Sequence, residues 1–154
     1  AADLVAEELI ADGADGAMVN LGGDLRAAGD SDAGAWVVRV DEPAAGVTAT
    51  VAFEAGAVAT STPLRRAWQH GAARRHHLID PARGLPFDDR APTLVSVVAA
   101  EAWFAEVSTK AAMALPPSLL EGVLEDAAAL IFMRDRSKQS VCSQSRLTTA
   151  ATIE

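Results

Sequence analysis

The first twelve residues place apolar side chains at helical spacing. Acidic residues occupy the other positions, and the apolar ones fall on roughly one side of a helix: Leu4, Val5, Leu9 and Ile10. Gly13 follows as a stop signal. The pattern predicts an amphipathic helix over residues 1–12.

Strand-like patterns come next. The short apolar segment 17–21 runs into Gly22 and Gly23, which predicts a strand that ends in a tight turn. Apolar positions alternate with others in residues 36–40 and again in residues 47–53. Because a connection containing proline and glycine joins these two segments, we expect them to form an antiparallel pair.

The middle of the chain is rich in turn-forming residues. Residues 64–70 follow Pro63 and predict one or two helical turns, which Gly71 would end. Several prolines and glycines in residues 71–92 predict an ordered loop, with a short extended piece at residues 76–79. Loops of this kind carry functional residues disproportionately.

The following segment predicts a strand and two helices. The β-branched run 93–99 predicts a buried strand, and residues 101–114 predict a helix that the two prolines at 116–117 end. Ser118 and Glu121 have the capping-box spacing in front of a further apolar pattern. We therefore expect a second helix to begin at Ser118.

Residues 128–133 and 139–143 predict a closing hairpin. The pattern as a whole predicts an α+β fold in one domain, with a mainly antiparallel sheet packed against helices. We expect the domain to span residues 1–143 and residues 144–154 to form a loosely attached tail.

Composition agrees with one domain, since the chain has 154 residues and half of them are hydrophobic. The single cysteine, Cys142, excludes an internal disulfide. No stretch approaches the ~18–20 apolar residues of a membrane span. A net charge of −8 argues against a general nucleic-acid or anionic-membrane surface, because both need a cationic face.

Charge is distributed unevenly. No acidic residue lies between Glu54 and Asp80, although the chain is acidic as a whole. The same window holds all three histidines and several arginines: Arg65, Arg66, His70, Arg74, Arg75, His76 and His77. Guanidinium groups match phosphate oxygens, so the window suits a phosphate-bearing ligand. The alternative is a solvated basic loop that pairs with acidic neighbours.

The segment 76–81 brings two imidazoles close to a carboxylate. A carboxylate such as Asp80 can fix the tautomer of a neighbouring histidine and raise its basicity for proton transfer. In the alternative interpretation, Asp80 caps the turn at Pro81, one histidine packs and the other is solvated.

Two strand ends carry further candidates for ligand binding. At Gly22 and Gly23 the backbone can approach a ligand and offer amides to an anion, or simply form a turn. The hydroxyls of Thr60, Ser61 and Thr62 suit phosphate or flavin edges, or Thr62 caps the helix expected after it.

Taken in order, these segments resemble the FAD:protein FMN transferase family, also called ApbE. The most specific element is His77-Leu78-Ile79-Asp80-Pro81 with Gly84, preceded by Ala59-Thr60-Ser61. The other matching segments are residues 19–26, 36–38, 84–86, 95–99 and 103–111. The resemblance spans residues 1 to about 115.

The resemblance implies a flavin transferase. Such enzymes use Mg²⁺ and FAD, join FMN through its phosphate to a Ser or Thr hydroxyl of an acceptor flavoprotein, and release AMP; some hydrolyse FAD to FMN and AMP instead. Relatives are longer, so we expect this chain to correspond to a carboxy-terminal half. Many relatives are periplasmic or membrane-anchored, which leaves the localisation open, and any export signal would precede Ala1.

With the motifs above, the resemblance assigns catalysis to His77 and Asp80 and a metal-ligand role to Glu106. The residues it assigns to flavin binding lie in the glycine turn, the strand end and the histidine loop: Asn20, Gly22, Gly23, Asp24, Thr60, Ser61 and Ile79.

One position departs from the family pattern. In relatives, an Asp and a Thr four residues later serve as metal ligands, whereas this chain has Glu106 and Lys110. An ammonium cannot coordinate Mg²⁺, and Thr109 lies about 100° round the helix from Lys110. Lys110 either supplies a cation beside the pyrophosphate or marks the loss of metal-dependent transfer. The simplest alternative is an ordinary helical ion pair, worth about 0.2–0.5 kcal/mol.

Three other functions remain open at this point. These alternatives are a catalytically silent flavin-binding or carrier protein, an FAD pyrophosphatase, and an accessory domain that completes a site with another polypeptide.

Overall fold

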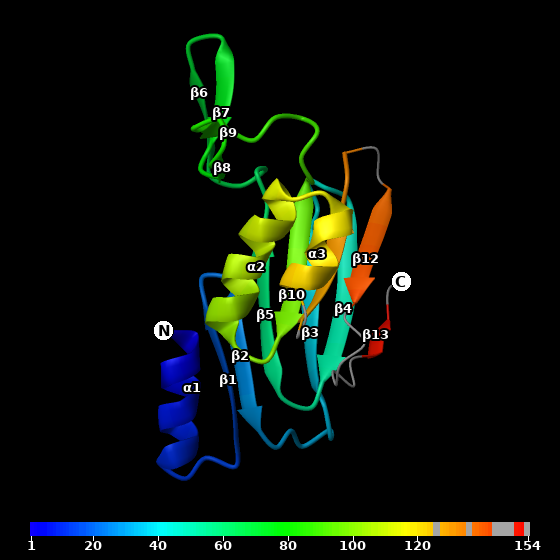
Figure 1. The fold of residues 1–154 in the computed structure, drawn as a ribbon. Helices are drawn as coiled ribbons and strands as arrows, with labels where there is room; N and C mark the ends of the chain where they lie inside the picture. The colour runs from blue at the N-terminus through cyan, green and yellow to red at the C-terminus, as the bar shows by residue number, and fades with distance from the viewer. Residues whose placement is uncertain (125–126, 135–136, 143–149, 153–154) are drawn as a thin grey trace.

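The main sheet has six strands, and every neighbouring pair in it is antiparallel (Figure 1). The computed structural model describes residues 1–124, 127–134, 137–142 and 150–152. In spatial order the strands are β1 (Gly16–Leu21), β2 (Asp24–Gly29), β5 (Gly56–Ser61), β10 (Leu94–Ala99), β11 (Ala127–Phe132) and β12 (Lys138–Cys142).

A second sheet covers one face of the main sheet. It consists of β3 (Trp36–Glu42), β4 (Val47–Phe53) and β13 (Ala150–Thr152). Residues of β4 alternate between buried and more exposed positions, and Val51 and Phe53 pack into a core shared with Leu25 and Val98 of the main sheet. The predicted antiparallel pair at residues 36–40 and 47–53 is confirmed.

Helices cover the opposite face. These are α1 (Ala2–Ala11), α2 (Ala102–Ala114) and α3 (Pro117–Val123). Along β5, Val58 faces the second sheet, while Ala57 and Ala59 pack beneath the helices. Because successive side chains point to opposite faces and both faces are covered, β5 and β10 are buried almost throughout. The α+β class with a mainly antiparallel sheet in one domain is confirmed.

The first helix is confirmed, but the side that it buries was predicted wrongly. α1 buries Ala2, Asp3 and Ala6, and it leaves Leu4, Val5 and Leu9 exposed. Alanine side chains let the helix pack closely on β1 and β2. Asp3 accepts hydrogen bonds from the first amides of α2, Ala102 N at 2.7 Å and Trp103 N at 3.0 Å. Capping of α2, rather than burial of large side chains, therefore sets the rotation of α1.

The helical turns predicted at residues 64–70 are wrong. Residues 67–76 form a hairpin of β6 (Ala67–His70) and β7 (Ala73–His76), which we call the arm. Gly71, with φ +59°, turns the chain between the two strands instead of ending a helix. The arm projects beyond the end of the main sheet (Figure 1). The loop predicted at residues 71–92 contains the second strand of the arm, and it also contains a further small pair, β8 (Ile79–Asp80) with β9 (Leu85–Pro86), so the extended piece expected at residues 76–79 is misplaced.

The carboxy-terminal helices and strands are of the predicted types, but their boundaries differ from the predicted ones. The helix at α2 and the hairpin of β11 with β12 are confirmed. α3 begins one residue before Ser118, so Ser118 lies inside its first turn and makes no side-chain cap. Of the expected tail, residues 150–152 pair with β4 as β13, and the rest lies outside the described residues.

Candidate functional site

The β1–β2 turn consists of two glycines in left-handed backbone conformations. Gly22 has φ +71° and Gly23 has φ +111°. An added Cβ would meet nothing within 4 Å at either position, so the backbone conformation and not crowding requires glycine. Asn20 Oδ1 accepts a hydrogen bond from Gly23 N at 3.0 Å and fixes the turn.

A cavity of about 220 Å³, which we call the sheet cavity, lies between this turn and the second sheet. Four residues that the sequence analysis assigned to flavin binding line it: Asn20, Gly22, Gly23 and Thr60. Arg65 and Glu42 also line it and pair at 2.6 Å. Small-molecule pockets usually measure ~300–1,000 Å³, so this cavity can hold only part of a dinucleotide.

Thr60 and Ser61 face opposite sides of the main sheet. Thr60 Oγ1 lies 2.9 Å from Ser96 Oγ on the side of the sheet cavity. Ser61 is buried on the helix side, with its Oγ 2.7 Å from Thr109 Oγ1. Since Thr109 donates to the Glu106 carbonyl at 2.7 Å, Ser61 is the donor of this pair. Ser61 therefore anchors α2 and does not share a ligand wall with Thr60.

Four charged or titratable side chains gather on the helix side, and we call them the charged cluster: Asp24, His77, Glu106 and Lys110. Lys110 Nζ donates to Glu106 Oε1 across one turn of α2. Asp24 directly follows the glycine turn, so the charged cluster and the sheet cavity meet at the start of β2.

The groups of the charged cluster shift one another's pKa values. Burial raises the pKa of Asp24 above its ordinary value, and the Glu106 carboxylate raises it further, while the Lys110 ammonium opposes both. Burial lowers the pKa of His77, and the positive charges of Arg66 and Lys110 act in the same direction. Lys110 therefore lies within electrostatic reach of both the glycine turn and the histidine loop.

The histidine loop follows the alternative interpretation of segment 76–81. His76 is buried; its Nδ1 accepts from Leu78 N at 3.3 Å, so its Nε2 carries the proton that is donated to the Phe87 carbonyl at 3.0 Å. Asp80 Oδ1 accepts from Ala82 N at 2.9 Å and caps the turn. His77 is exposed, and within the described part of the chain no hydrogen bond joins Asp80 to either imidazole.

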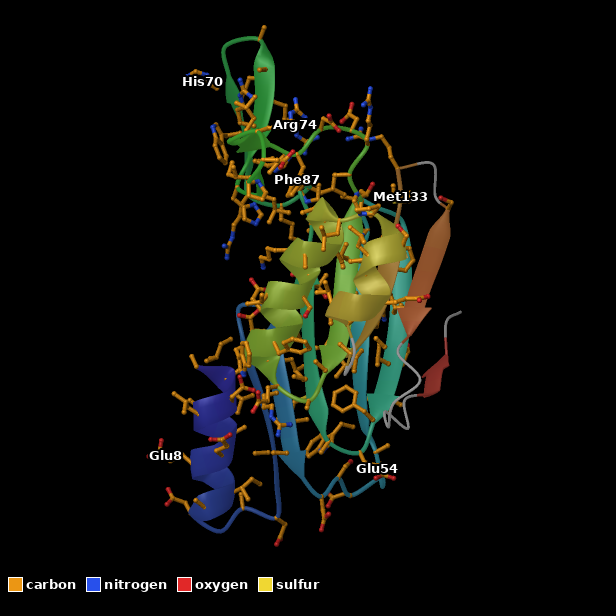
Figure 2. All side chains as sticks on the ribbon, in the orientation of Figure 1. Glu8, Glu54, His70, Arg74, Phe87 and Met133 are labelled. Carbon is orange, nitrogen blue, oxygen red and sulfur yellow. The ribbon has the colours of Figure 1, made fainter. Side chains whose placement is uncertain are left out.

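A larger cavity of about 730 Å³ lies where the loop after β8 meets α2 and α3. Its floor is apolar and includes Met113, Leu120 and Ile131, and its rim carries Asp80 and Arg83. Its volume falls within the ~300–1,000 Å³ usual for small-molecule pockets. Phe87 and Met133, which also line it, lie at the end of the molecule from which the arm with His70 and Arg74 projects (Figure 2).

The site assignments are thus divided among three places. Asn20, Gly22, Gly23 and Thr60 line the sheet cavity; Asp24, His77 and Glu106 belong to the charged cluster; Asp80 lines the larger cavity. Ser61 is buried under α2, and Ile79 is exposed on β8. The sequence analysis missed Glu42 and the larger cavity, because an acid on a strand carries no motif and the lining comes from segments far apart in sequence.

The residues present do not fit a magnesium ion. Among the described residues there is no group of three or more His, Cys, Asp or Glu side chains that could hold a metal. Glu106 is bound to Lys110, and Asp24 is the carboxyl group that faces it. Mg²⁺ requires near-octahedral oxygen coordination, which these side chains do not supply.

Among the residues that the structure describes, no helix has the length and apolar character to cross a membrane.

Comparisons with known proteins agree with the resemblance. The family model described as the ApbE family matches residues 1–132. The FAD:protein FMN transferase of Vibrio cholerae is 32% identical over 92 residues, which cover 57% of this chain and 28% of that protein.

Solved structures share the fold. The ApbE protein of Thermotoga maritima has a TM-score of 0.77 at 24% identity, covering 94% of this chain and 48% of that one. The flavin transferase ApbE of Vibrio cholerae has a TM-score of 0.67 at 25% identity, covering 94% of this chain and 47% of that one. The chain spans about half the length of these solved relatives.

Proposed function

The chain belongs to the ApbE family, and from that premise we propose that it binds FAD and transfers the FMN part to a Ser or Thr hydroxyl of an acceptor flavoprotein, with release of AMP. The observation that carries the proposal is the charged cluster. It joins a glycine turn, a helix and a histidine loop that are far apart in sequence, and Lys110 acts electrostatically on both Asp24 and His77.

The proposed reaction is a phosphoryl transfer. The acceptor oxygen forms a bond to the phosphorus of the FMN phosphate while the bond from that phosphorus to the bridging oxygen breaks, and AMP leaves with that oxygen. The transition state spreads negative charge over the phosphate oxygens, so catalysis depends on positioning and on nearby cations. Lys110 and Arg66, which both act electrostatically on His77, are the cations proposed for this role.

His77 is the proposed general base. Its lowered pKa keeps the exposed imidazole neutral near pH 7, so it has a free lone pair for the proton of the acceptor hydroxyl. Asp80, bound to Ala82 N, supports the reaction by holding the loop that carries His77.

Two cavities are proposed to share the dinucleotide. The sheet cavity offers the backbone of Gly22 and Gly23 and the hydroxyl of Thr60, and the larger cavity has an apolar floor of the size an aromatic ring system needs. The charged cluster meets the sheet cavity at Asp24, which suits a diphosphate bridge at that point.

Incubation of the protein with FAD and an acceptor flavoprotein that offers a Ser or Thr hydroxyl tests the proposal by measurement of AMP, FMN and acceptor-bound flavin. We expect AMP to form together with flavin bound covalently to an acceptor. His77→Ala should lower the rate by about 10²–10⁴-fold, the usual contribution of a general base. His70→Ala is the matched control, because His70 is also exposed but lies at the tip of the arm.

Other outcomes separate the rival functions. AMP with free FMN and no bound flavin would indicate an FAD pyrophosphatase. FAD binding without AMP would indicate a silent flavin-binding protein. Absence of FAD binding would refute the proposal.

A further inference from the structure

Lys110 occupies the place where two acidic side chains converge. Glu106 lies four residues before it on α2, and Asp24 reaches the same place from the start of β2. We propose that the Lys110 ammonium stands in for a divalent cation here, so that the charged cluster neutralises phosphate oxygens without a metal ion. The phosphate part of this inference rests on the proposed function, and the exclusion of a metal ion does not.

Electrostatic interaction with a second element distinguishes Lys110 from an ordinary helical ion pair. A pair confined to one helix needs only Glu106 and Lys110 at i and i+4. Here Asp24 adds a second carboxyl group from the main sheet, and its partial burial beside Glu106 makes a nearby positive charge favourable. The Lys110 ammonium therefore acts on both carboxyl groups, and the amino-terminal ammonium of the chain also acts on Asp24.

The position of Lys110 leaves it accessible to a ligand. Its side chain is 44% exposed, and that of Glu106 is 35% exposed. Arg66 and His77 face the same region from the segments before and after the arm. An anionic ligand that approaches this region therefore meets Lys110, which is paired with Glu106, together with Arg66.

The residue type also fits the role. Lysine is rare in this chain, which has only Lys110 and Lys138 among its 13 basic residues. A lysine ammonium is a compact point charge with three donors, whereas a guanidinium is a planar fork. Of the two cationic side chains, the ammonium is the closer substitute for a small spherical cation.

A divalent cation would have to displace this ammonium. It would then find carboxylate oxygens from two side chains, Asp24 and Glu106, and no third acidic, histidine or cysteine side chain among the described residues. While Lys110 is in place, its positive charge repels a second cation at short range.

Binding of Mn²⁺, followed by electron paramagnetic resonance without any flavin, tests the inference. The wild-type chain and Lys110→Arg should bind Mn²⁺ weakly. Lys110→Thr should bind one Mn²⁺ at least about tenfold more tightly, because it removes the repulsion and adds an oxygen ligand. Lys110→Met, which removes the charge alone, should give a smaller gain.

Arg134→Met is the matched control. Arg134 also pairs with a carboxylate, Asp89 at 2.5 Å, next to a second one, Asp88. We expect no gain in Mn²⁺ binding from this variant. An equal gain in Arg134→Met, tight binding of one Mn²⁺ by the wild type, or no gain in Lys110→Thr would each overturn the inference.

Binding of ADP, a probe with a diphosphate, tests the phosphate role. Wild-type affinity should be the same with EDTA and with Mg²⁺. Lys110→Met should lose about tenfold in EDTA. A wild-type protein that binds ADP only with Mg²⁺ would overturn the phosphate role. If neither ADP nor FAD binds while the Mn²⁺ results hold, the proposed function fails and the exclusion of a metal ion stands.

Discussion

His76 and His77 are adjacent in the chain and have different chemistry in the fold. His76 is buried, and hydrogen bonds at both of its ring nitrogens hold it in place. His77 is exposed and lies near Arg66 and Lys110. Of the two, only His77 is therefore placed to exchange a proton with a ligand.

The charge environment of His77 predicts its titration. Because burial and nearby cations disfavour the protonated imidazole, its pKa in the folded protein should lie below the ordinary 6.5. Arg66→Gln removes one of these cations, which favours protonation and should raise the pKa. Proton NMR of the imidazole signals as a function of pH measures both values.

Arg134→Gln is the control for this titration, because Arg134 pairs with Asp89 and is not among the groups that shift His77. It should leave the midpoint of His77 unchanged. A midpoint at or above 6.5 in the wild type, or a lower one in Arg66→Gln, would contradict the assigned environment.

At the level of residues, sequence motifs predicted local conformation better than which side chains meet. The glycine turn was predicted correctly, because two glycines after an apolar run leave few other conformations. Thr60 and Ser61 were expected to act together, but the two-residue period of a strand separates them. The meeting of Asp24 with Lys110 depends on how α2 packs across the sheet, which no local pattern contains.

At the level of elements, α1 and α2 are joined through one carboxylate. α2 has no side-chain cap from its own N-cap residue, Glu101. Asp3 of α1 supplies the missing acceptors to Ala102 N and Trp103 N, and Arg26 Nε lies 3.5 Å from it. A negative charge also suits the positive end of the helix dipole.

Removal of this carboxylate should destabilise the fold. Asp3→Ala leaves two backbone amides at the start of α2 without their acceptor, at a cost of about 2–3 kcal/mol in the free energy of unfolding. Asp3→Asn should lie between Asp3→Ala and the wild type, since one amide oxygen still accepts. Urea denaturation measures the difference as a lower midpoint with an unchanged slope.

Glu7→Ala tests whether the effect is specific to the cap. Glu7 lies on the exposed side of α1, so its loss should change the stability by less than about 0.5 kcal/mol. Equal destabilisation by Asp3→Ala and Glu7→Ala would show that the helix, and not the cap, is what the substitution weakens.

Tertiary contacts explain the elements that the sequence misplaced. The apolar pattern of α1 gave the helix but not its buried side, because Asp3 has to reach α2. The segment before Gly71 has a helix-compatible pattern, yet it pairs with residues 73–76 as a strand of the arm. In the first case a partner distant in sequence decided the outcome, and in the second the neighbouring strand β7 did.

At the level of the whole molecule, charge is separated along its length. The chain carries −8 overall, but the arm and its flanking segments contain arginines and histidines without any acidic residue. Figure 2 places His70 and Arg74 at one end and Glu8 and Glu54 toward the other. The arm thus places positive charge at one end of an acidic protein, where Asp88 and Asp89 also lie beside Arg74 and Arg75.

The balance between these charges predicts how salt affects FAD association. At 0.1 M salt, interactions are screened beyond ~10 Å, so the arm should act on the diphosphate more strongly than the distant acids do. The association rate constant, measured by stopped-flow flavin fluorescence, should fall as salt increases. Replacement of both Arg74 and Arg75 by Gln should lower it about tenfold at low salt, at the lower end of electrostatic steering.

A second double variant separates the arm from net charge. Glu8→Gln with Glu54→Gln changes the net charge by the same amount in the opposite direction, but far from the arm. If position decides, this variant should leave the rate constant nearly unchanged. If net charge decides, it should raise the rate constant as much as the arginine substitutions lower it, and salt should accelerate wild-type association, because it would screen the repulsion between an acidic protein and an anionic ligand.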